Sequence, residues 1–281
     1  MSYAKTVRGF NAMSSPPPLS IIMPCLDEVN NIRSAINDAL KELDDGNIVG
    51  EVIVINDGST DDSISIIKEK ASTDKRVRVI NKEKTEGIGK GFWTGVNVSK
   101  YEFVVLIPGD NENSPSEVLS FYHLVNDVDV VIPFILNAEV RSISRRFISS
   151  LYRLIINISF GTTLNYTNGI VIYNKAALQS VALRSSGFFY QTELLIKLLR
   201  RGFLYAEVPQ FLSKRKGGKS KALTLRSFFE LLVSFIRLIV DVQILGVEGF
   251  SLSASDLPVT TRTYQKYVML EESGKLNKTN V

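Results

Sequence analysis

The chain has 281 residues, a hydrophobic content of 44% and a formal net charge of only +4. This length suits one large domain or two small ones with a sizeable core, and so small a charge gives no general electrostatic footprint for nucleic acid. One cysteine and one histidine exclude a disulfide framework and multi-cysteine or multi-histidine metal sites, and they argue against a Ser-His-Asp triad. The chemistry is therefore expected to use carboxylates, Lys and Arg side chains, backbone amides or a bound ion.

Residues 1–18 contain scattered Lys and Arg and end in Ser-Ser-Pro-Pro-Pro. This composition predicts a flexible lead-in rather than a signal peptide. No 18-residue stretch is free of charged and strongly polar residues, so no membrane-spanning helix is expected.

The next part of the chain alternates short apolar runs with helical patterns. The expected strands are Leu19–Pro24, Glu51–Asn56, Val77–Ile80, Phe103–Ile107 and Val128–Ile132, and the helices between them end near Leu43, Ala71, Val98 and Asn126. Such alternation predicts βαβ units and a mostly parallel sheet. In sheets of this kind, ligands bind at the carboxyl ends of the strands.

An acidic loop follows the fourth expected strand, where Asp110 and Glu112 are separated by one residue. Alternate residues of an extended backbone point the same way, so these carboxylates are predicted to hold Mg²⁺ or Mn²⁺ together with a diphosphate. The loop alone is more typical of a helix cap, because Ser114-Pro115 suits an N-cap followed by Pro. Two other acidic turns at strand ends, residues 24–28 and 56–59, favour the metal site.

A glycine-rich loop, Gly87-Ile-Gly89-Lys90-Gly91, precedes the helix that ends near Val98. Free backbone N–H groups and a lysine in this position suit phosphate oxygens. The spacing matches neither the dinucleotide fingerprint nor the Walker loop, so a plain flexible turn explains the loop equally well.

The second half is richer in basic and apolar residues. Residues 141–160 place four arginines among apolar side chains, which indicates a helix at an anionic membrane surface or an ordinary packing helix. Residues 214–221 carry five cations around Gly-Gly, as either a solvated charge run or a loop that closes over phosphates. The charges within 223–245 favour an interfacial or partner-packing helix over a membrane span.

Strands are expected at Thr167–Tyr173 and Phe203–Val208, a helix at Tyr190–Arg201, and a loosely held tail from about Ser251.

Eight short motifs then occur in a characteristic order. They are Pro24-x-x-Asp-Glu28-x-x-Asn31, Asn56-Asp57-Gly58-Ser59, Gly87-x-Gly89-Lys90-Gly91, Asp110-x-Glu112, Thr167-Asn-Gly169, Gln191-x-Glu193, Glu207-Val-Pro209 and Arg215-x-Gly-Gly-Lys219. This order resembles family-2 glycosyltransferases, in particular the dolichol-phosphate mannosyltransferase-like or polyprenyl-phosphate sugar synthase branch. The resemblance covers Leu19 to Lys221 and implies a single α/β domain of GT-A type, with a mostly parallel central sheet flanked by helices. An apolar amphipathic helix over 222–249 and a tail over 250–281 are expected to follow this domain.

The resemblance implies an inverting glycosyltransferase that uses a UDP- or GDP-sugar donor and Mg²⁺ or Mn²⁺. The implied acceptor is a polyprenyl or dolichyl phosphate. By their matching positions, Pro24, Leu26 and Glu28 would line the nucleoside pocket, Asp57 would hold the base or ribose, Asp110 and Glu112 would hold the metal, and Gly89, Lys90, Arg215 and Lys219 would meet phosphates. If the acceptor is a hydroxyl instead, as in a cell-envelope polysaccharide, a base is needed, and Asp110, Glu112 and Glu193 are the candidates.

Two other hypotheses keep the fold but change the function. A sugar-phosphate nucleotidyltransferase would have a Gly-rich basic loop after the first strand, where this chain has Pro24-Cys-Leu-Asp-Glu28. A non-catalytic, membrane-surface nucleotide-sugar-binding protein is supported by Asn56, Asn165 and Val171, which depart from the family's usual residues. In either the enzyme or the binding protein, we expect a cytoplasmic location with peripheral contact at the cytoplasmic face of a membrane.

Overall fold

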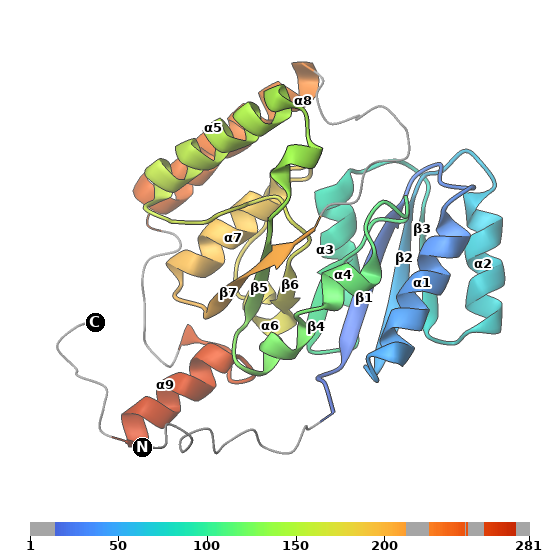
Figure 1. Cartoon of the computed structure of the whole chain (residues 1–281), viewed down its shortest axis with the longest axis horizontal. Helices are drawn as coiled ribbons and strands as arrows, with labels where there is room; N and C mark the ends of the chain where they lie inside the picture. The colour runs from blue at the N-terminus through green and yellow to red at the C-terminus, as the bar shows by residue number, and fades with distance from the viewer. Residues whose placement is uncertain (1–14, 212–224, 245, 247–255, 274–281) are drawn as a thin grey trace, which may run out of the picture.

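The computed structural model describes residues 15–211, 225–244, 246 and 256–273 (Figure 1). Its centre is a seven-stranded sheet in the order β3-β2-β1-β4-β6-β5-β7. The strands are β1 (Leu19–Cys25), β2 (Gly50–Asp57), β3 (Val77–Lys82), β4 (Phe103–Leu106), β5 (Val130–Ile135), β6 (Ile172–Asn174) and β7 (Tyr205–Gln210). The longer helices are α1 (Ile32–Asp45), α2 (Ser63–Thr73), α3 (Ile88–Val98), α5 (Ile143–Phe160), α7 (Tyr190–Arg200), α8 (Leu225–Ile239) and α9 (Arg262–Glu272).

The first half of the sheet is parallel and buried on both faces. Strands β1, β2 and β4 consist almost entirely of buried residues, as expected for strands covered by helices on both sides. Successive side chains alternate between two cores. Ile22 of β1 packs with the α3 side of the sheet, whereas Ile21 and Met23 pack with the side covered by α1 and α2.

The second half of the sheet reverses direction at one strand. Strand β6 is antiparallel to both β4 and β5, and β5 pairs in parallel with β7. Four of the six pairings are therefore parallel, which confirms the predicted mostly parallel α/β sheet flanked by helices.

Three local predictions differ from the structure. The helix expected over 115–126 is divided into α4 (Pro115–Leu119) and a 3₁₀ segment (Tyr122–Asn126). The strand expected from Thr167 begins only at Ile172. The loosely held tail after Ser251 is wrong for Arg262–Glu272, which forms α9.

Helix α9 is fastened to the sheet by a buried carboxylate. Asp129, fully buried at the start of β5, accepts hydrogen bonds from the backbone N–H groups of Arg262 (2.7 Å) and Thr263 (2.9 Å). The Thr263 hydroxyl in turn accepts a bond from the backbone of Leu204 (2.8 Å). Burial raises the pKa of Asp129. Because the partners come from positions distant in sequence, the local pattern of 251–273 gave no sign of this anchor.

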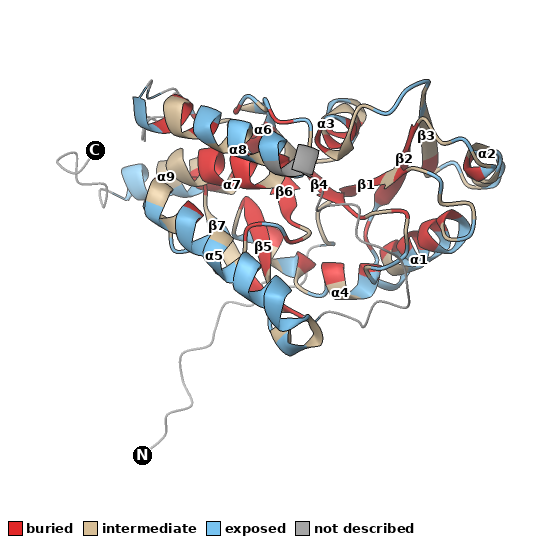
Figure 2. Cartoon of the chain, turned by 90° about the horizontal axis from the view of Figure 1, so that it is seen from above, coloured by how far each residue is buried: buried red, intermediate tan, exposed pale blue. Residues whose placement is uncertain are grey.

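The buried residues of α5 and α8, which include Ile156, Phe160 and Leu238, pack into the same core as α3 and α7. Seen from above, α5 and α8 form two separate rods, with α7 and the strands β5 and β6 visible between them (Figure 2). They meet where Phe160 packs edge-to-face on Phe235, with ring centroids 6.0 Å apart. Among the described helices, none has the length and apolar character that a crossing of the bilayer would require.

Candidate active site

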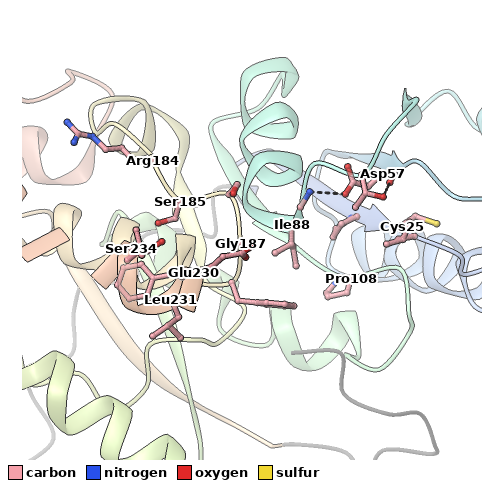
Figure 3. Close-up of a pocket in the computed structure, with 18 of the residues that line it drawn as sticks. Cys25, Asp57, Ile88, Pro108, Arg184, Ser185, Gly187, Glu230, Leu231 and Ser234 are labelled. Atoms are coloured by element: carbon pink, nitrogen blue, oxygen red, sulfur yellow. Dashed lines mark hydrogen bonds between the residues drawn. The ribbon is translucent and has the colours of Figure 1, made fainter. Parts of the chain in front are cut away.

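A cavity of about 900 Å³ opens at the carboxyl ends of β1 and β2. One wall comes from the loops after β1, β2 and β4, and the opposite wall from residues 184–189 and from α8 (Figure 3). The polar and charged side chains in its lining are Cys25, Glu28, Asp57, Thr85, Asp110, Arg184, Ser185, Ser186, Glu230, Ser234 and Arg237. Its position agrees with the general rule for open α/β sheets.

The loops after β1 and β2 are joined by hydrogen bonds between side chains and backbone. The backbone N–H of Asp27 donates to the Ser59 hydroxyl (3.0 Å), and the Asp27 carboxylate accepts from the backbone of Thr60 (2.7 Å). The backbone N–H of Glu28 donates to the Ser63 hydroxyl (2.9 Å). These bonds fix the segment from which Pro24, Leu26 and Glu28 line the cavity, and their place in a nucleoside pocket stays a prediction.

Asp57 also lies in this wall, and its carboxylate organises the glycine-rich loop. Its oxygens accept from the backbone N–H groups of Glu86 and Gly87 at 3.1–3.2 Å. The N–H of Gly89 donates to the Ser186 carbonyl (2.8 Å), and that of Gly91 to the Gly87 carbonyl (2.9 Å). The prediction that the loop offers free amides is therefore wrong for its three glycines.

Lys90 points to a carboxylate rather than into the cavity. Its ammonium pairs with Glu86, which Lys82 also contacts at 2.7 Å. The hydrogen bond from Lys82, and then that from Lys90, lowers the pKa of Glu86 to about 2. Lys90 is absent from the cavity lining, so a phosphate contact by its side chain requires a change of rotamer.

The structure separates the two carboxylates of the acidic loop. Asp110 lines the cavity, whereas Glu112 is exposed outside it. Asn111 between them has a φ of 55°, so the segment is turned rather than extended. The alternation that predicted two carboxylates facing one point therefore does not apply. The helix-cap explanation is also incomplete, because Ser114 makes no capping hydrogen bond from its side chain.

Whether the cavity could hold a divalent cation depends on the oxygen ligands near Asp110. No cluster of three His, Cys, Asp or Glu side chains suited to a metal occurs within the described residues. Mg²⁺, however, is usually held by one or two carboxylates together with substrate phosphates and water. Asp110, alone or with a reoriented Glu112, fits an ion that is completed by a ligand.

Glu193 lies outside the cavity lining and is 3% exposed. Its carboxylate accepts from the backbone of Arg184 and Ser185 (2.9 Å each) and pairs with Lys197 (2.8 Å). These bonds fix the segment that forms the opposite wall. The catalytic role predicted for Glu193 stays a prediction, and this geometry favours a positioning role.

Several lining residues carried no recognisable motif. Residues 184–187 lack a motif, and the residues of α8 that line the cavity carried only an amphipathic pattern, so sequence reasoning did not assign them to the site. Arg215 and Lys219, predicted to meet phosphates, lie outside the described residues. Cys25 also lines the cavity, and burial raises the pKa of its thiol to about 11, so it remains protonated at neutral pH.

A second cavity of about 450 Å³ adjoins the first and shares Ile88, Pro108, Phe188 and Leu231 with it. Three arginines line it, Arg141, Arg145 and Arg153. Its other walls come from residues 166–171, which include the predicted Thr167-Asn-Gly169 motif, and from Tyr152, Tyr173 and Tyr190. The two cavities therefore differ in charge.

Residues 20–182 match the family described as Glycosyl transferase family 2. The chain belongs to this family. It is thus a glycosyltransferase with a GT-A-type fold, and the nucleotidyltransferase alternative is not supported.

The relatives of this glycosyltransferase are named for different transfer reactions. An undecaprenyl-phosphate mannosyltransferase of Micrococcus luteus is 24% identical over 214 residues, covering 71% of this chain and 85% of the relative. A glucosyl-3-phosphoglycerate synthase of Mycolicibacterium paratuberculosis is 26% identical over 160 residues, or 54% of this chain. That match covers only 43% of the relative's length.

Solved structures show the same fold. The UDP complex of a Mycobacterium tuberculosis glucosyl-3-phosphoglycerate synthase superposes with a TM-score of 0.60 at 19% identity, covering 85% of this chain and 82% of that one. A second structure of that enzyme, with Mn²⁺, UDP and glucosyl-3-phosphoglycerate, gives a TM-score of 0.57 at 21% identity, covering 80% and 79% of the two chains.

Substitutions in the glycine-rich loop test the contact between the two cavity walls. A Cβ at Gly89 would lie 2.8 Å from the Ser185 carbonyl, whereas a Cβ at Gly91 would meet nothing closer than 3.8 Å. Gly89→Ala should therefore lower the free energy of unfolding by about 1–3 kcal/mol through overpacking. Gly91→Ala, the matched control, should leave it unchanged or raise it by up to about 1 kcal/mol. Urea denaturation measures both, and equal stability of the two variants would contradict this contact.

Proposed function

We propose that this glycosyltransferase moves a sugar, with inversion, from a UDP- or GDP-sugar to a polyprenyl or dolichyl phosphate. The observation that carries the proposal is the pair of adjoining cavities. One cavity holds Asp110 and the loops after β1 and β2, and the other is lined by three arginines. Their shared wall is where a donor and an acceptor would meet.

The donor belongs in the larger cavity. Pro24, Leu26 and Glu28 would bound the nucleoside, and Asp57 would orient the base or ribose at the place where it already holds the Gly87 loop. Mg²⁺ or Mn²⁺ on Asp110, with Glu112 in reach after a turn of the loop, would neutralise charge on the leaving diphosphate. Lys90, Arg215 and Lys219 remain candidates for phosphate contacts, with Lys90 first leaving Glu86, whereas the N–H of Gly89 already donates to Ser186.

The charges in the larger cavity support a cation there. Four carboxylates line it, those of Glu28, Asp57, Asp110 and Glu230. Of the two arginines in the lining, Arg184 pairs with Asp241 at 2.9 Å, and of the carboxylates, Asp57 lies 3.7 Å from Lys82. A diphosphate entering such a lining is repelled unless a positive ion accompanies it.

The acceptor phosphate belongs in the second cavity. Arg141 stacks over the Tyr166 ring, and Arg153 donates to the Asn165 carbonyl. Within the described part of the chain, no ion pair joins Arg141, Arg145 or Arg153 to a carboxylate. Guanidinium groups without such partners are suited to bind a phosphate.

A phosphate acceptor also fits the shortage of a base. Its oxygen is already ionised at neutral pH and can attack the anomeric carbon without losing a proton first. A hydroxyl acceptor would need a carboxylate to take its proton. Glu193 is already bonded to Lys197 and to two backbone amides, which leaves Asp110 and Glu112 for that role.

The names of the two relatives point to different acceptors. The Micrococcus luteus protein is named for a polyprenyl phosphate and the mycobacterial proteins for a phosphoglycerate, so both names contain a phosphorylated acceptor. The exposed apolar faces of α5 and α8 beside the second cavity favour the lipid.

A panel of donors and acceptors tests this function. Purified full-length chain is incubated with UDP- and GDP-sugars and Mn²⁺, with farnesyl phosphate, 3-phosphoglycerate or no acceptor. We expect nucleotide release to increase with farnesyl phosphate. Release stimulated only by 3-phosphoglycerate would contradict the lipid acceptor. The absence of both release and thermal stabilisation by every donor would contradict the enzymatic proposal and leave a binding protein for another ligand.

Asp110 and Glu112 should differ in importance. Asp110→Asn should lower kcat for sugar transfer by about 100-fold or more, because the metal loses its ligand in the cavity wall. Glu112→Gln, at the exposed side of the same loop, should have a smaller effect. Undiminished turnover of the Asp110 variant with Mn²⁺ would contradict the metal assignment.

Membrane contact is proposed through the outer faces of α5 and α8. On α5 the exposed apolar residues recur at helical spacing, namely Ile143, Phe147, Ile148, Leu151, Leu154, Ile155 and Ile158. On α8, Leu232 and Ile236 are exposed outside the cavity lining, and the exposed Phe229 and Val233 lie at the cavity itself. Arg146 on α5, exposed and outside the lining of the second cavity, would add attraction to anionic headgroups.

Substituting one apolar residue should weaken this contact. Phe147 on α5 is 69% exposed, and Met269 is 67% exposed on α9, which lies at the bottom of the view whereas α5 lies at the top (Figure 1). Phe147→Gln should reduce binding to anionic liposomes by about tenfold, since a buried aromatic side chain contributes roughly 1.5–3 kcal/mol. Met269→Gln should have no effect. Liposome flotation measures both, and a wild-type chain that stays wholly in the aqueous fraction would contradict the membrane proposal.

A further inference from the structure

A network of buried charges lies behind the cavity wall, between α7 and the end of α8. Its members Glu193, Lys197 and Asp241 are 3%, 1% and 3% exposed. Lys197 donates to Glu193 at 2.8 Å and lies 4.0 Å from Asp241. Asp241 also accepts from the guanidinium of Arg184 at 2.9 Å. Charges this deeply buried are stable only when they are paired, so each member depends on the others.

The network holds the 182–187 segment from several directions. Glu193 accepts from the backbone of Arg184 and Ser185, and Lys197 donates to the Ala182 carbonyl at 2.5 Å. The side chain of Arg184 extends away from the residues of the opposite cavity wall (Figure 3). Arg184 therefore connects the cavity wall to Asp241 rather than presenting a free cation to the cavity.

Asp241 comes from an irregular turn at the end of α8. Residues Val240–Ile244 form a π-helix, a form that is rare and is found often at functional sites. This turn buries Asp241 and Val242, while Gln243 donates to the Ser159 carbonyl of α5 at 2.8 Å. The end of α8 is thereby fixed to α7 through Asp241 and to α5 through Gln243.

Helix α8 in turn forms part of the cavity. Its lining residues are Phe229, Glu230, Leu231, Val233, Ser234 and Arg237, and Glu230, Leu231 and Ser234 lie beside Ser185 and Gly187 (Figure 3). A Cβ on Gly187 would come within 3.7 Å of the Glu230 carboxylate. A change in the seat of α8 would therefore alter the cavity wall directly.

We propose that Asp241 is a positioning residue that seats α8 over the donor cavity through the Arg184–Asp241–Lys197–Glu193 network. The proposal rests on the proposed function, because it assigns the donor to that cavity. Leu232 and Ile236 of α8 are exposed and lie outside the cavity lining. The network therefore fixes a helix that has one side at the molecular surface and another side at the donor cavity.

The experiment compares two buried aspartates that fasten C-terminal helices. Asp241→Asn removes the charge at α8, and Asp129→Asn removes the charge at α9, which is not part of the cavity. Both variants should melt at a lower temperature. Only Asp241→Asn should raise the KM for the nucleotide-sugar, by about tenfold, with a smaller change in kcat. A loss of thermal stability alone, with KM unchanged, would reduce Asp241 to a structural anchor and overturn the proposal.

A second substitution covers the case in which Asp241→Asn fails to fold. The side chain of Arg184 is 52% exposed, so Arg184→Gln should fold and should raise the donor KM by a similar factor. In the double variant the two effects should not add, because both remove one interaction. Full additivity would contradict the network.

Hydrogen exchange separates this proposal from the function itself. Amides of residues 225–244 should exchange faster in Asp241→Asn than in wild type or Asp129→Asn, whether or not a donor is turned over. Unchanged exchange there would overturn the seating role even in an active enzyme. Faster exchange in a chain that turns over no donor would keep the seating role and refute only the proposed function.

Discussion

The two halves of the sheet are joined at the site by a backbone contact that leaves no room for a side chain. Gly89 at the start of α3 donates to the Ser186 carbonyl, and a Cβ there would lie within 2.9 Å of both the Ser185 and the Ser186 carbonyls. On one side of this contact, Asp57 holds the Gly87 loop to β2. On the other side, Glu193 holds the 184–185 backbone to α7. Both cavity walls are therefore fixed relative to each other by hydrogen bonds to backbone groups.

The sequence predicted the first half of the fold well because there the local pattern and the tertiary role agree. Apolar β-branched runs such as Val52–Ile55 became strands buried on both faces. Prediction was poorer where long-range partners decide the structure. Asp129 fixes α9 from more than 130 residues away, and the pattern of Arg262–Glu272 alone is weakly amphipathic. The short β6 likewise depends on pairing with β4 and β5.

Five residues that the family resemblance assigned to the site line one cavity, and the roles given to them stay predictions. They are Pro24, Leu26, Glu28, Asp57 and Asp110. The directions of the Glu112 and Lys90 side chains were not predicted, because a backbone turn decides the first and an ion pair decides the second. The left-handed Asn111 turns Glu112 away, and Glu86 engages Lys90. Because these two effects depend on backbone angles and on neighbouring side chains, residue spacing alone could not reveal them.

The charged residues that line one cavity are mainly carboxylates, and those that line the other are arginines. This difference affects how an anionic donor and an anionic acceptor could approach each other. A nucleotide-sugar and a phosphate acceptor repel, and the repulsion grows as water is excluded. The larger cavity has carboxylates in excess, which suits a diphosphate only as a complex with a cation. The smaller cavity has arginines without carboxylate partners among the described residues, which suits a bare phosphate. On the proposed function, each anion would therefore be neutralised in its own cavity before the two meet beside Ile88, Pro108, Phe188 and Leu231, where the shared wall is largely apolar. An uncharged hydroxyl acceptor would gain little from such an arrangement, so the arginines favour a phosphate on physical grounds that are independent of any relative's name.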